Sequence, residues 1–382
     1  MAPLSATESR ERNLAASGFL SFVREDKMAS TIPLENSRPC AYIERATTLI
    51  DGGIMDGMDI PAGWEKSAHM IISRRWRRIL VIGASDSGKS TYCHFLSLRL
   101  AEHDPPVAIV DADIGQKDIG PPASLTLGYT GHGVELGAIA PASFFFVGAV
   151  SPVRHLLPMV VGVKQLTDLA RAPFTIINTT GLIRGVGRIL KGYKIEALEP
   201  DVIVAIQRAH ETESILRAYR NHDIIRLHCS PKAVLKTPEQ RRIARERAFS
   251  AYFQRAAEHS FDLRELVFQR TLLFSGKTIK HRDFVHFERT SEGLFAISDR
   301  PVANRNNVKL TPAGFESNLL AGVADRNNHC LGLAILHRID FEGRTIALTT
   351  PVQPENAQII QFGDIYINAD GIELDRKRRD GY

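Results

Sequence analysis

The stretch of sequence that decides the fold is the octapeptide Gly83-Ala84-Ser85-Asp86-Ser87-Gly88-Lys89-Ser90, which fits the pattern G-x-x-x-x-G-K-[ST]. The apolar run RILVI (78–82) precedes it, and an amphipathic helix is predicted after it from STYCHFLSLRL (90–100). Backbone N–H groups of such a turn, and the positive end of the helix that follows, together form a cradle for phosphate groups. A glycine-rich turn can match this pattern by chance, but the strand before it and the helix after it argue against chance.

The octapeptide therefore predicts a binding site for ATP, GTP or another NTP together with Mg²⁺. Lys89 is expected to reach the β- and γ-phosphates, and the Ser90 hydroxyl is expected to ligate the metal. The predicted nucleotide-binding residues are consecutive in the chain: Gly83, Ala84, Ser85, Asp86, Ser87, Gly88, Lys89, Ser90 and Thr91.

A second strand supplies carboxylates. The run VAIVDAD (107–113) is apolar until Asp111 and Asp113, and Gln116 follows shortly after. Alternate residues of a strand share one face, so both acids can face the phosphates from the carboxyl end of the strand. One of them would hold the metal and the other would accept a proton from an attacking hydroxyl. A solvated strand end is the alternative interpretation.

Strand-like and helix-like runs alternate between about residues 73 and 265. The strand-like runs are mostly continuous apolar stretches, as in a sheet covered on both faces, at 78–82, 107–110, 143–147, 175–178, 201–206 and 223–228. Helices are predicted between them at 89–102, 152–171 and 211–221. This alternation predicts an α/β fold with a doubly wound parallel sheet.

The two ends of the chain have other patterns. From Leu266 onward, short strand-like runs at 331–339, 345–348, 359–362 and 365–367 are separated by Gly, Asn, Asp and Pro. They predict a smaller, antiparallel β-rich domain. Residues 38–70 are glycine-rich and predict a short β-rich lead-in. The polar residues before them predict a mobile segment. Either Met1 or Met28 is expected to be the first residue of the protein. The predicted organisation is a lead-in segment (1–72), a P-loop domain (73–265) and a C-terminal β-rich domain (266–382).

The composition is that of an ordinary globular protein, with 382 residues, 44% of them hydrophobic and 24% charged. A net charge of +5 permits an acidic partner without establishing one. The four scattered cysteines have neither zinc-site spacing nor the density of a disulfide framework, which predicts reduced thiols in a cytoplasmic protein. No apolar run reaches the roughly 18 residues of a membrane span, and we expect no secretion signal and no membrane partner.

Three stretches resemble the polynucleotide 5′-hydroxyl kinase family, which includes the RNA kinase of the eukaryotic mRNA cleavage factor, the pre-rRNA-processing kinases, and archaeal and bacterial relatives. They are GASDSGKST (83–91), VDADIGQ with GPPASLTLG (110–128), and INTTGLIRGVGRILKGYKIEALEPDVIVAIQR (177–208). The D-x-D-x-G-Q form is more specific than the octapeptide. The resemblance continues more weakly to the GIEL ending at 371–374.

The resemblance implies an enzyme that moves the γ-phosphate of an NTP onto the 5′-hydroxyl end of RNA or DNA. It implies Asp113 as the general base and Asp111 as its partner acid near Mg²⁺. Thr180 and Gly181 match a loop beside the acceptor nucleotide. The family often has Trp at the next position, where this chain has Leu182, so aromatic stacking on a substrate base is not implied there.

A helix that starts at Thr237-Pro238 is similar to the family's arginine lid. Thr237 is a predicted N-cap with Gln240 three residues on, and Arg241 and Arg245 share a helical face. Both arginines are predicted to stabilise the charge of the transferring phosphoryl group. Lys236 stands where the family has an upstream arginine and cannot make the same bidentate contact. A solvated cationic face is the alternative.

A further set of basic residues recurs at near-helical spacing: Arg184, Arg188, Lys191 and Lys194. This set predicts either a track that binds acceptor phosphates, with Arg184 as a substrate-binding residue, or basic side chains that are simply solvated.

The predicted function is that of an RNA-processing kinase, in which Gln116 also contacts the acceptor. The alternatives are a non-catalytic or weakly active NTP-binding subunit of an RNA-processing complex, a small-molecule kinase, and a GTPase switch. The last is disfavoured because the guanine-reading N-K-x-D motif does not occur.

Overall fold

The computed structural model describes residues 59–300 and 307–375. The predictions for the N-terminal segment up to residue 58 lie outside these residues. The P-loop half of the chain, in order, contains α1 Ala62–Arg74, β1 Arg78–Gly83, α2 Lys89–His103, β2 Val107–Ala112, β3 Ser124–Thr130, η1 Leu136–Ala138, β4 Pro141–Phe146, α3 Leu156–Leu169, β5 Phe174–Thr179, α4 Val186–Leu198, β6 Val202–Gln207, α5 Glu213–Leu216, η2 Arg217–Tyr219, β7 Asp223–His228 and α6 Pro238–Phe253.

The sheet of the P-loop half has a parallel group of five strands, as predicted, which forms one end of the sheet. Its strand order is β2-β5-β1-β6-β7, and every neighbouring pair in this group runs parallel. The sheet as a whole is mixed, however, because β3 pairs antiparallel with β2, and β4 pairs antiparallel with β3. Strand β3 is not predicted from the sequence, because its apolar run is interrupted by Gly128 and follows Pro121 and Pro122.

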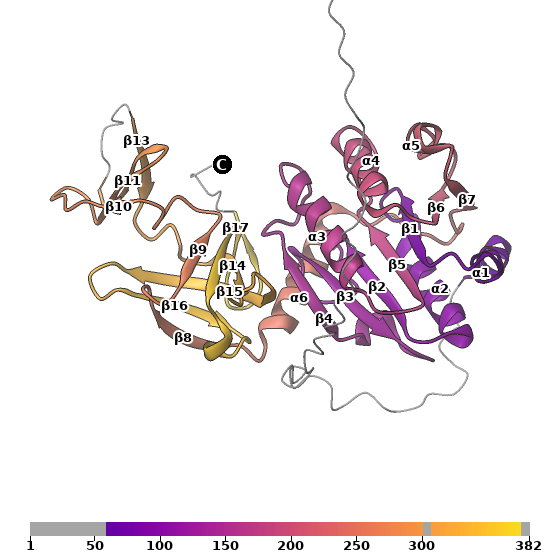
Figure 1. The fold of residues 1–382 in the computed structure, drawn as a ribbon, viewed down its shortest axis with the longest axis horizontal. Coiled ribbons are helices and arrows are strands. Elements are labelled where there is room, and N and C mark those ends of the chain that lie inside the picture. The colour runs from indigo at the N-terminus through magenta and orange to yellow at the C-terminus, as the bar shows by residue number, and fades with distance from the viewer. Residues whose placement is uncertain (1–58, 301–306, 376–382) are drawn as a thin grey trace, which may run out of the picture. The chain divides into compact units, whose positions relative to one another are not determined.

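Helices cover both faces of this sheet (Figure 1). Alternate residues of each strand point to opposite faces, so β1 contributes Leu80 and Ile82 to one buried cluster and Ile79 and Val81 to another. The first cluster also contains residues of α3, α4 and α5, and the second contains residues of α1 and α2. The continuous apolar strands recognised in the sequence are thus explained by burial on both sides.

The lead-in was expected to be β-rich, but its described part is helical. In α1, Trp64, Ala68 and Ile71 are all buried and recur at spacings of four and three residues, which is the period of a helix with one buried face. The helix ends at Arg75 in a left-handed conformation with φ of 54°. The glycines that suggested turns lie mostly before this helix.

The C-terminal strands follow, and most of them join the same sheet. They are β8 Ala257–Asp262, β9 Val267–Gln269, β10 Lys277–Thr278, β11 His286–Thr290, β12 Gly293–Ser298, β13 Val308–Pro312, β14 Leu319–Ala324, β15 Cys330–Asp340, β16 Thr345–Thr350, β17 Ile359–Ile367 and β18 Glu373–Leu374, with the 3₁₀ turn η3 at Pro354–Asn356. A bridge between Cys330 and Phe144 joins β15 to β4. Strands β10–β13 form a separate four-stranded sheet.

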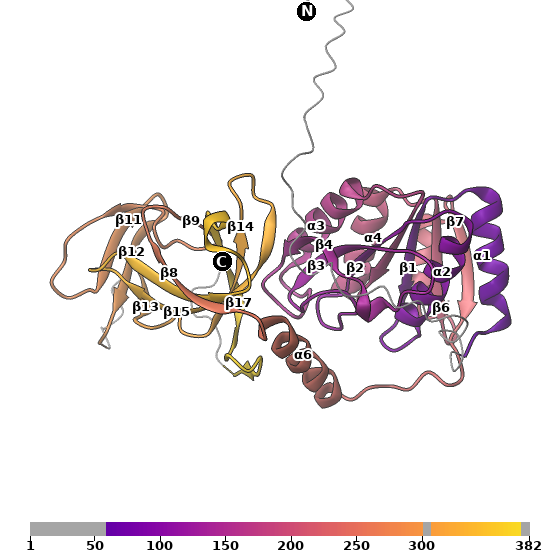
Figure 2. The same ribbon diagram turned by 90° about the horizontal axis from the view of Figure 1, so that it is seen from below.

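Two predictions about this β-rich part need correction. Strand β8 begins at Ala257 and pairs with β16, so the β-rich strands start before the predicted boundary at residue 266. The predicted strands at 359–362 and 365–367 are one strand, β17, that runs through Gly363. Helix α6 connects the P-loop half to β8 (Figure 2), and its Phe249 and Phe253 are buried in a cluster with residues of β14 and β15.

Candidate active site

Three neighbouring strands end at the same edge of the sheet. Strand β5 lies between β1 and β2, and Asn178 is in register with both Val81 of β1 and Asp111 of β2. The segments that follow these strands are the P-loop, residues 180–182 and residues 113–119. The carboxyl edge of a parallel sheet is where ligands bind in open α/β folds, so the three predicted motifs meet where that chemistry is expected.

The P-loop has the backbone shape of a phosphate cradle. Asp86 and Gly88 have positive φ angles of 54° and 87°, which turn the chain around the cradle. A Cβ on Gly83 would lie 2.5 Å from the Ile206 carbonyl oxygen, so only glycine fits between β1 and β6 at this point. The loop leads directly into α2, which begins at Lys89. Ala84 and Ser90 are half-buried, Ser87 is buried, and Ser85 and Thr91 are exposed.

Lys89 is buried and folds back over the cradle. Its Nζ donates a hydrogen bond of 2.6 Å to the Ala84 carbonyl. Burial lowers the pKa of Lys89, and the largest opposing influence is the charge of Asp113.

The loop of residues 180–182 lies against the P-loop. A Cβ on Gly181 would lie 2.4 Å from the Ser85 Oγ and 2.5 Å from the Ser85 Cα and N atoms. The preceding residue, Thr180, is buried and accepts hydrogen bonds from Lys191 Nζ at its carbonyl (2.7 Å) and its hydroxyl (3.1 Å). Leu182 is half-buried, and Arg184 is exposed.

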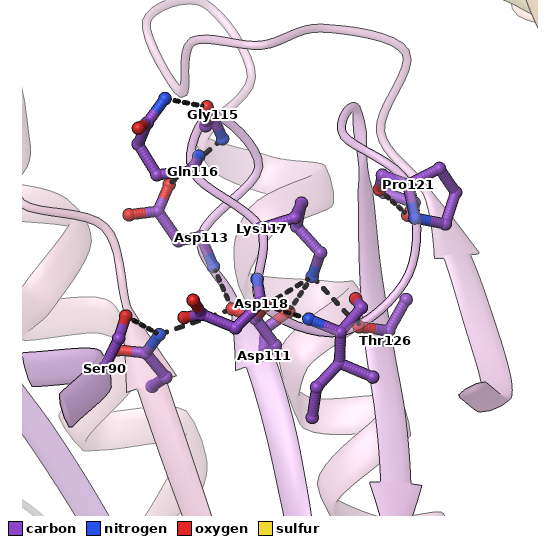
Figure 3. Close-up of polar contacts among 12 residues, drawn as sticks. Ser90, Asp111, Asp113, Gly115, Gln116, Lys117, Asp118, Pro121 and Thr126 are labelled. Carbon is purple, nitrogen blue, oxygen red and sulfur yellow. Dashed lines mark hydrogen bonds and ion pairs between the residues drawn. The ribbon is translucent and has the colours of Figure 1, made fainter. Parts of the chain in front are cut away.

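Asp111 is buried, and both of its carboxylate oxygens already have donors (Figure 3). Oδ2 accepts from the backbone N–H groups of Asp118 (2.9 Å) and Ile119 (3.2 Å) and pairs with Lys117 Nζ at 3.1 Å. Oδ1 accepts from the Asp113 N–H at 3.2 Å and from Asn178 Nδ2 at 3.4 Å. The side chain thereby holds the whole loop of residues 113–119 in place.

Asp113 is half-buried and leaves one oxygen with no hydrogen bond from the loop. Its Oδ1 accepts from the N–H groups of Gly115 (3.0 Å) and Gln116 (3.1 Å). A Cβ on Gly115 would lie 2.8 Å from the Val150 carbonyl oxygen, so glycine is required for this turn. The Gln116 amide in turn donates to the Arg241 carbonyl at 3.3 Å, which places the D-x-D-x-G-Q loop beside α6.

Two residues at this edge had no assigned role in the sequence prediction. Asp118 is the third acid of the run 111–118, and its Oδ2 is buried with no hydrogen-bond partner. Burial and the neighbouring Asp111 raise the pKa of Asp118 to about 6, although a Ser90 contact opposes that shift. Asn178 ends the apolar part of β5, and its Nδ2 lies 3.4 Å from both Ser90 Oγ and Asp111 Oδ1. The position of these polar residues next to recognised motifs is the signal that could have identified them.

Helix α6, the predicted lid, starts as predicted. In α6 the Thr237 hydroxyl accepts from the Gln240 N–H, and the Gln240 side chain accepts from the Thr237 N–H, which completes a capping box. The Arg241 guanidinium forms an ion pair with Asp86 of the P-loop. Burial alone would raise the pKa of Asp86, but Arg241 and the Lys236 N–H hold it below its ordinary value.

The two arginines predicted to act from α6, Arg241 and Arg245, have different partners. Arg245 forms a two-point ion pair with Glu373 of β18, so it is held by the C-terminal strands and not by the P-loop. Arg242 is exposed and pairs with Glu239 and Glu246 on its own helix. Of the predicted pair, Arg241 is the one that contacts the cradle.

The predicted basic track is not a continuous surface. Arg184 and Arg188 are exposed, but Lys191 and Lys194 of α4 are fully buried. Both lysines lie on the inner face of α4 with Leu190 and other apolar residues, so they cannot form a solvent-facing track. Burial lowers the pKa of Lys194 to about 7, and its Nζ has no hydrogen-bond partner.

Two kinds of site are absent from residues 59–300 and 307–375. No group of three or more His, Cys, Asp or Glu side chains there could hold a metal ion on its own. Mg²⁺ is ordinarily held by one or two protein ligands together with substrate phosphates, which requires no such group. Within the same residues, no helix combines the length and the apolar character needed to cross a bilayer. Cys93, Cys229 and Cys330 are free thiols.

Comparisons with known proteins agree with this geometry. Residues 83–255 match the family model described as the mRNA cleavage and polyadenylation factor CLP1 P-loop. The chain is 33% identical over 337 residues to the polyribonucleotide 5′-hydroxyl-kinase of Pyrococcus furiosus, a match that covers 83% of this chain and 95% of that protein. It is 32% identical over 332 residues to the enzyme of the same description from Methanocaldococcus jannaschii, with coverage of 81% and 92%.

A solved structure shows the same fold. The wild-type Clp1p–Pcf11p complex matches with a TM-score of 0.56 at 11% identity, over 79% of this chain and 78% of that chain. At this level of identity the likeness concerns the fold alone.

Proposed function

Because this chain belongs to the polynucleotide 5′-hydroxyl kinase family of P-loop proteins, we propose that it transfers the γ-phosphate of an NTP to the 5′-hydroxyl end of RNA. The observation that carries this proposal is the meeting of three motifs at one sheet edge: the P-loop, the Asp113 carboxylate and the 180–182 loop. A phosphate cradle, a base and an acceptor loop are the parts that such a transfer needs.

The P-loop binds the NTP in this proposal. The backbone of residues 83–91 and the start of α2 surround the phosphates, and Lys89 exchanges its contact with the Ala84 carbonyl for phosphate oxygens. Ser90 and the carboxylates of residues 111–118 are hard oxygen ligands, which suit Mg²⁺. The buried Asp118 oxygen without a partner supports the fit of a cation here. Bound Mg²⁺ would neutralise charge on the phosphates.

Asp113 acts as the general base. Its Oδ1 is fixed by two backbone N–H groups, which orients the carboxylate toward the end of the strand and leaves Oδ2 for the acceptor hydroxyl. The register of β2 with β5, and of β5 with β1, brings residue 113 to the sheet edge at which the P-loop lies and so supports a position across from the phosphates. General-base catalysis of this kind contributes typically about 10²- to 10⁴-fold to the rate.

Arg241 is the lid arginine that reaches the transferring phosphoryl group. Its partner in this structure is Asp86 inside the P-loop, so a small movement of α6 brings the guanidinium to the γ-phosphate. Arg245 would serve the same role only after it leaves Glu373. Developing charge on the phosphoryl oxygens provides the driving force for either contact.

The acceptor end lies along the 180–182 loop. Thr180 and Gly181 form its floor against the P-loop, Leu182 offers an apolar contact, and the exposed Arg184 contacts the acceptor backbone. Gln116, which bridges to the lid, completes the acceptor contacts. A cytoplasmic setting with NTP and RNA ends is part of this proposal.

A second candidate function is an NTP-binding subunit of an RNA-processing complex with weak or no transfer. Leu182 in place of the family's frequent Trp, and the engagement of Arg245 with Glu373, favour it.

Transfer of labelled γ-phosphate to oligonucleotides tests the proposal and separates it from this alternative. Wild-type protein with ATP and Mg²⁺ should label 5′-hydroxyl RNA, and Lys89→Ala should lose labelling while Arg242→Ala, a lid arginine that faces solvent, retains it. Matched RNA and DNA, single-stranded and duplex, define the acceptor. Binding of ATP by wild-type protein without any labelling would support the second candidate and overturn the first.

A further inference from the structure

We propose that Asp118, and not Asp111, is the carboxylate that completes the Mg²⁺ site beside Ser90. The inference rests on the proposed kinase function, because it names the metal ligand of that same site. Asp111 becomes a positioning residue that shapes the loop, and Lys117 becomes its fixed counter-ion.

The contacts of Asp111 leave it little capacity for a metal. Its two oxygens receive three backbone N–H groups, the Asn178 amide and the Lys117 ammonium. Lys117 is itself fully buried and also donates to the Asp111 carbonyl at 2.8 Å and to the Thr126 hydroxyl at 2.9 Å. A metal ion bound to Asp111 would have to displace the Lys117 ammonium group, which is buried and has no path to solvent. The pair therefore behaves as a structural unit.

Asp118 has the opposite character. Its backbone N–H is held by Asp111, which fixes the residue, while its Oδ2 is buried and accepts no hydrogen bond. Figure 3 shows its carboxylate directed toward Ser90. A buried charged oxygen without a donor is costly unless a cation or donor arrives, and a divalent cation beside the P-loop serine would supply that partner.

Asn178 provides an independent second observation at the same place. Its Nδ2 faces Ser90 Oγ and Asp111 Oδ1, and its own Oδ1 is buried without a hydrogen-bond partner. Two buried oxygens without hydrogen-bond partners, Asp118 Oδ2 and Asn178 Oδ1, thus belong to side chains that lie next to the Ser90 hydroxyl. Oxygen donors of this kind, few in number and completed by phosphates and water, are what Mg²⁺ selects.

Metal affinity tests the inference without reference to RNA. Mn²⁺ is titrated into the full chain with a non-hydrolysable ATP analogue, and bound metal is measured by electron paramagnetic resonance. Asp118→Asn keeps the shape of the side chain and should weaken Mn²⁺ binding by about tenfold or more. Asp104→Asn, an exposed acid just after α2, should bind like the wild type. An Asp118→Asn affinity within twofold of wild type overturns the inference.

Thermal unfolding in EDTA supplies a second readout. Asp118→Asn removes an unsatisfied buried charge and should unfold at the wild-type temperature or above it, whereas Asp111→Asn breaks the buried pair with Lys117 and should unfold lower. Reversed stabilities, or a folded Asp111→Asn that alone loses Mn²⁺, contradict the assignment. If wild-type protein fails to phosphorylate RNA yet Asp118→Asn still loses Mn²⁺, the proposed acceptor is wrong and the metal assignment stands.

Discussion

Replacing Gly181 with alanine should separate the acceptor loop from the P-loop. The added Cβ would meet Ser85 at 2.4 Å from Oγ and 2.5 Å from the backbone N and Cα. A side chain could rotate away, but the P-loop backbone cannot, because it is fixed between β1 and α2. One of the two loops must therefore move.

The size of the movement follows from these distances. Carbon atoms in ordinary contact are about 3.5 Å apart, so the loops must move apart by about 1 Å. Overpacking of this kind typically costs about 1–3 kcal/mol of stability. A misplacement of about 1 Å in a reacting geometry can lower the rate by about 10²-fold. We therefore expect Gly181→Ala to remain folded and to transfer phosphate about a hundredfold more slowly.

The assay compares initial rates of γ-phosphate transfer to a 5′-hydroxyl RNA with thermal unfolding of the same samples. Gly131→Ala is the matched control, because a Cβ at that glycine would meet nothing within 4 Å. It should behave like the wild type in both measurements. If Gly181→Ala has the kcat and KM of the wild type, the two loops are not in close contact at Gly181 and Ser85.

Three further substitutions test other parts of the structure. Leu182→Trp should raise affinity for single-stranded RNA by about 1–3 kcal/mol if residue 182 faces a base. An unchanged dissociation constant in fluorescence anisotropy titrations would show that residue 182 does not face a base. Thr237→Ala should lower the free energy of unfolding by about 1 kcal/mol through loss of the α6 cap, as measured by denaturant titration. The buried Lys194 has a pKa of about 7 in the folded protein, against about 10.4 when unfolded, so its burial cost is largest below pH 7 and shrinks as the pH rises. Relative to Lys194→Met, the wild type should therefore gain on the order of 2 kcal/mol of unfolding free energy between pH 7 and pH 9, and parallel pH dependences for the two proteins would contradict the assigned burial.

Local patterns in the sequence predicted the parts of the fold that depend on local physics. The P-loop, its strand and helix, and the capped start of α6 were predicted because their signals lie within a few consecutive residues. The parallel strands were predicted because burial on both faces requires continuous apolar runs. Helix α1 was missed because the glycines before it outweighed the spacing of Trp64, Ala68 and Ile71.

The distribution of charge at the site could not be predicted in the same way. Lys191 and Lys194 resemble surface lysines in sequence, and only the packing of α4 beneath the 180–182 loop makes them buried. The difference between Asp111 and Asp118 depends on where Lys117 points, which is a tertiary contact. Likewise, nothing local links Arg241 to Asp86, or Arg245 to Glu373.

The most direct test of the central claim is the transfer rate of Asp113→Asn, measured together with ATP affinity in the same preparation. We expect ATP binding close to that of the wild type and a loss of γ-phosphate transfer to 5′-hydroxyl RNA of about 10²-fold or more. Transfer at the wild-type rate by this variant would contradict the claim that the carboxylate at 113 activates the acceptor across from the phosphate cradle.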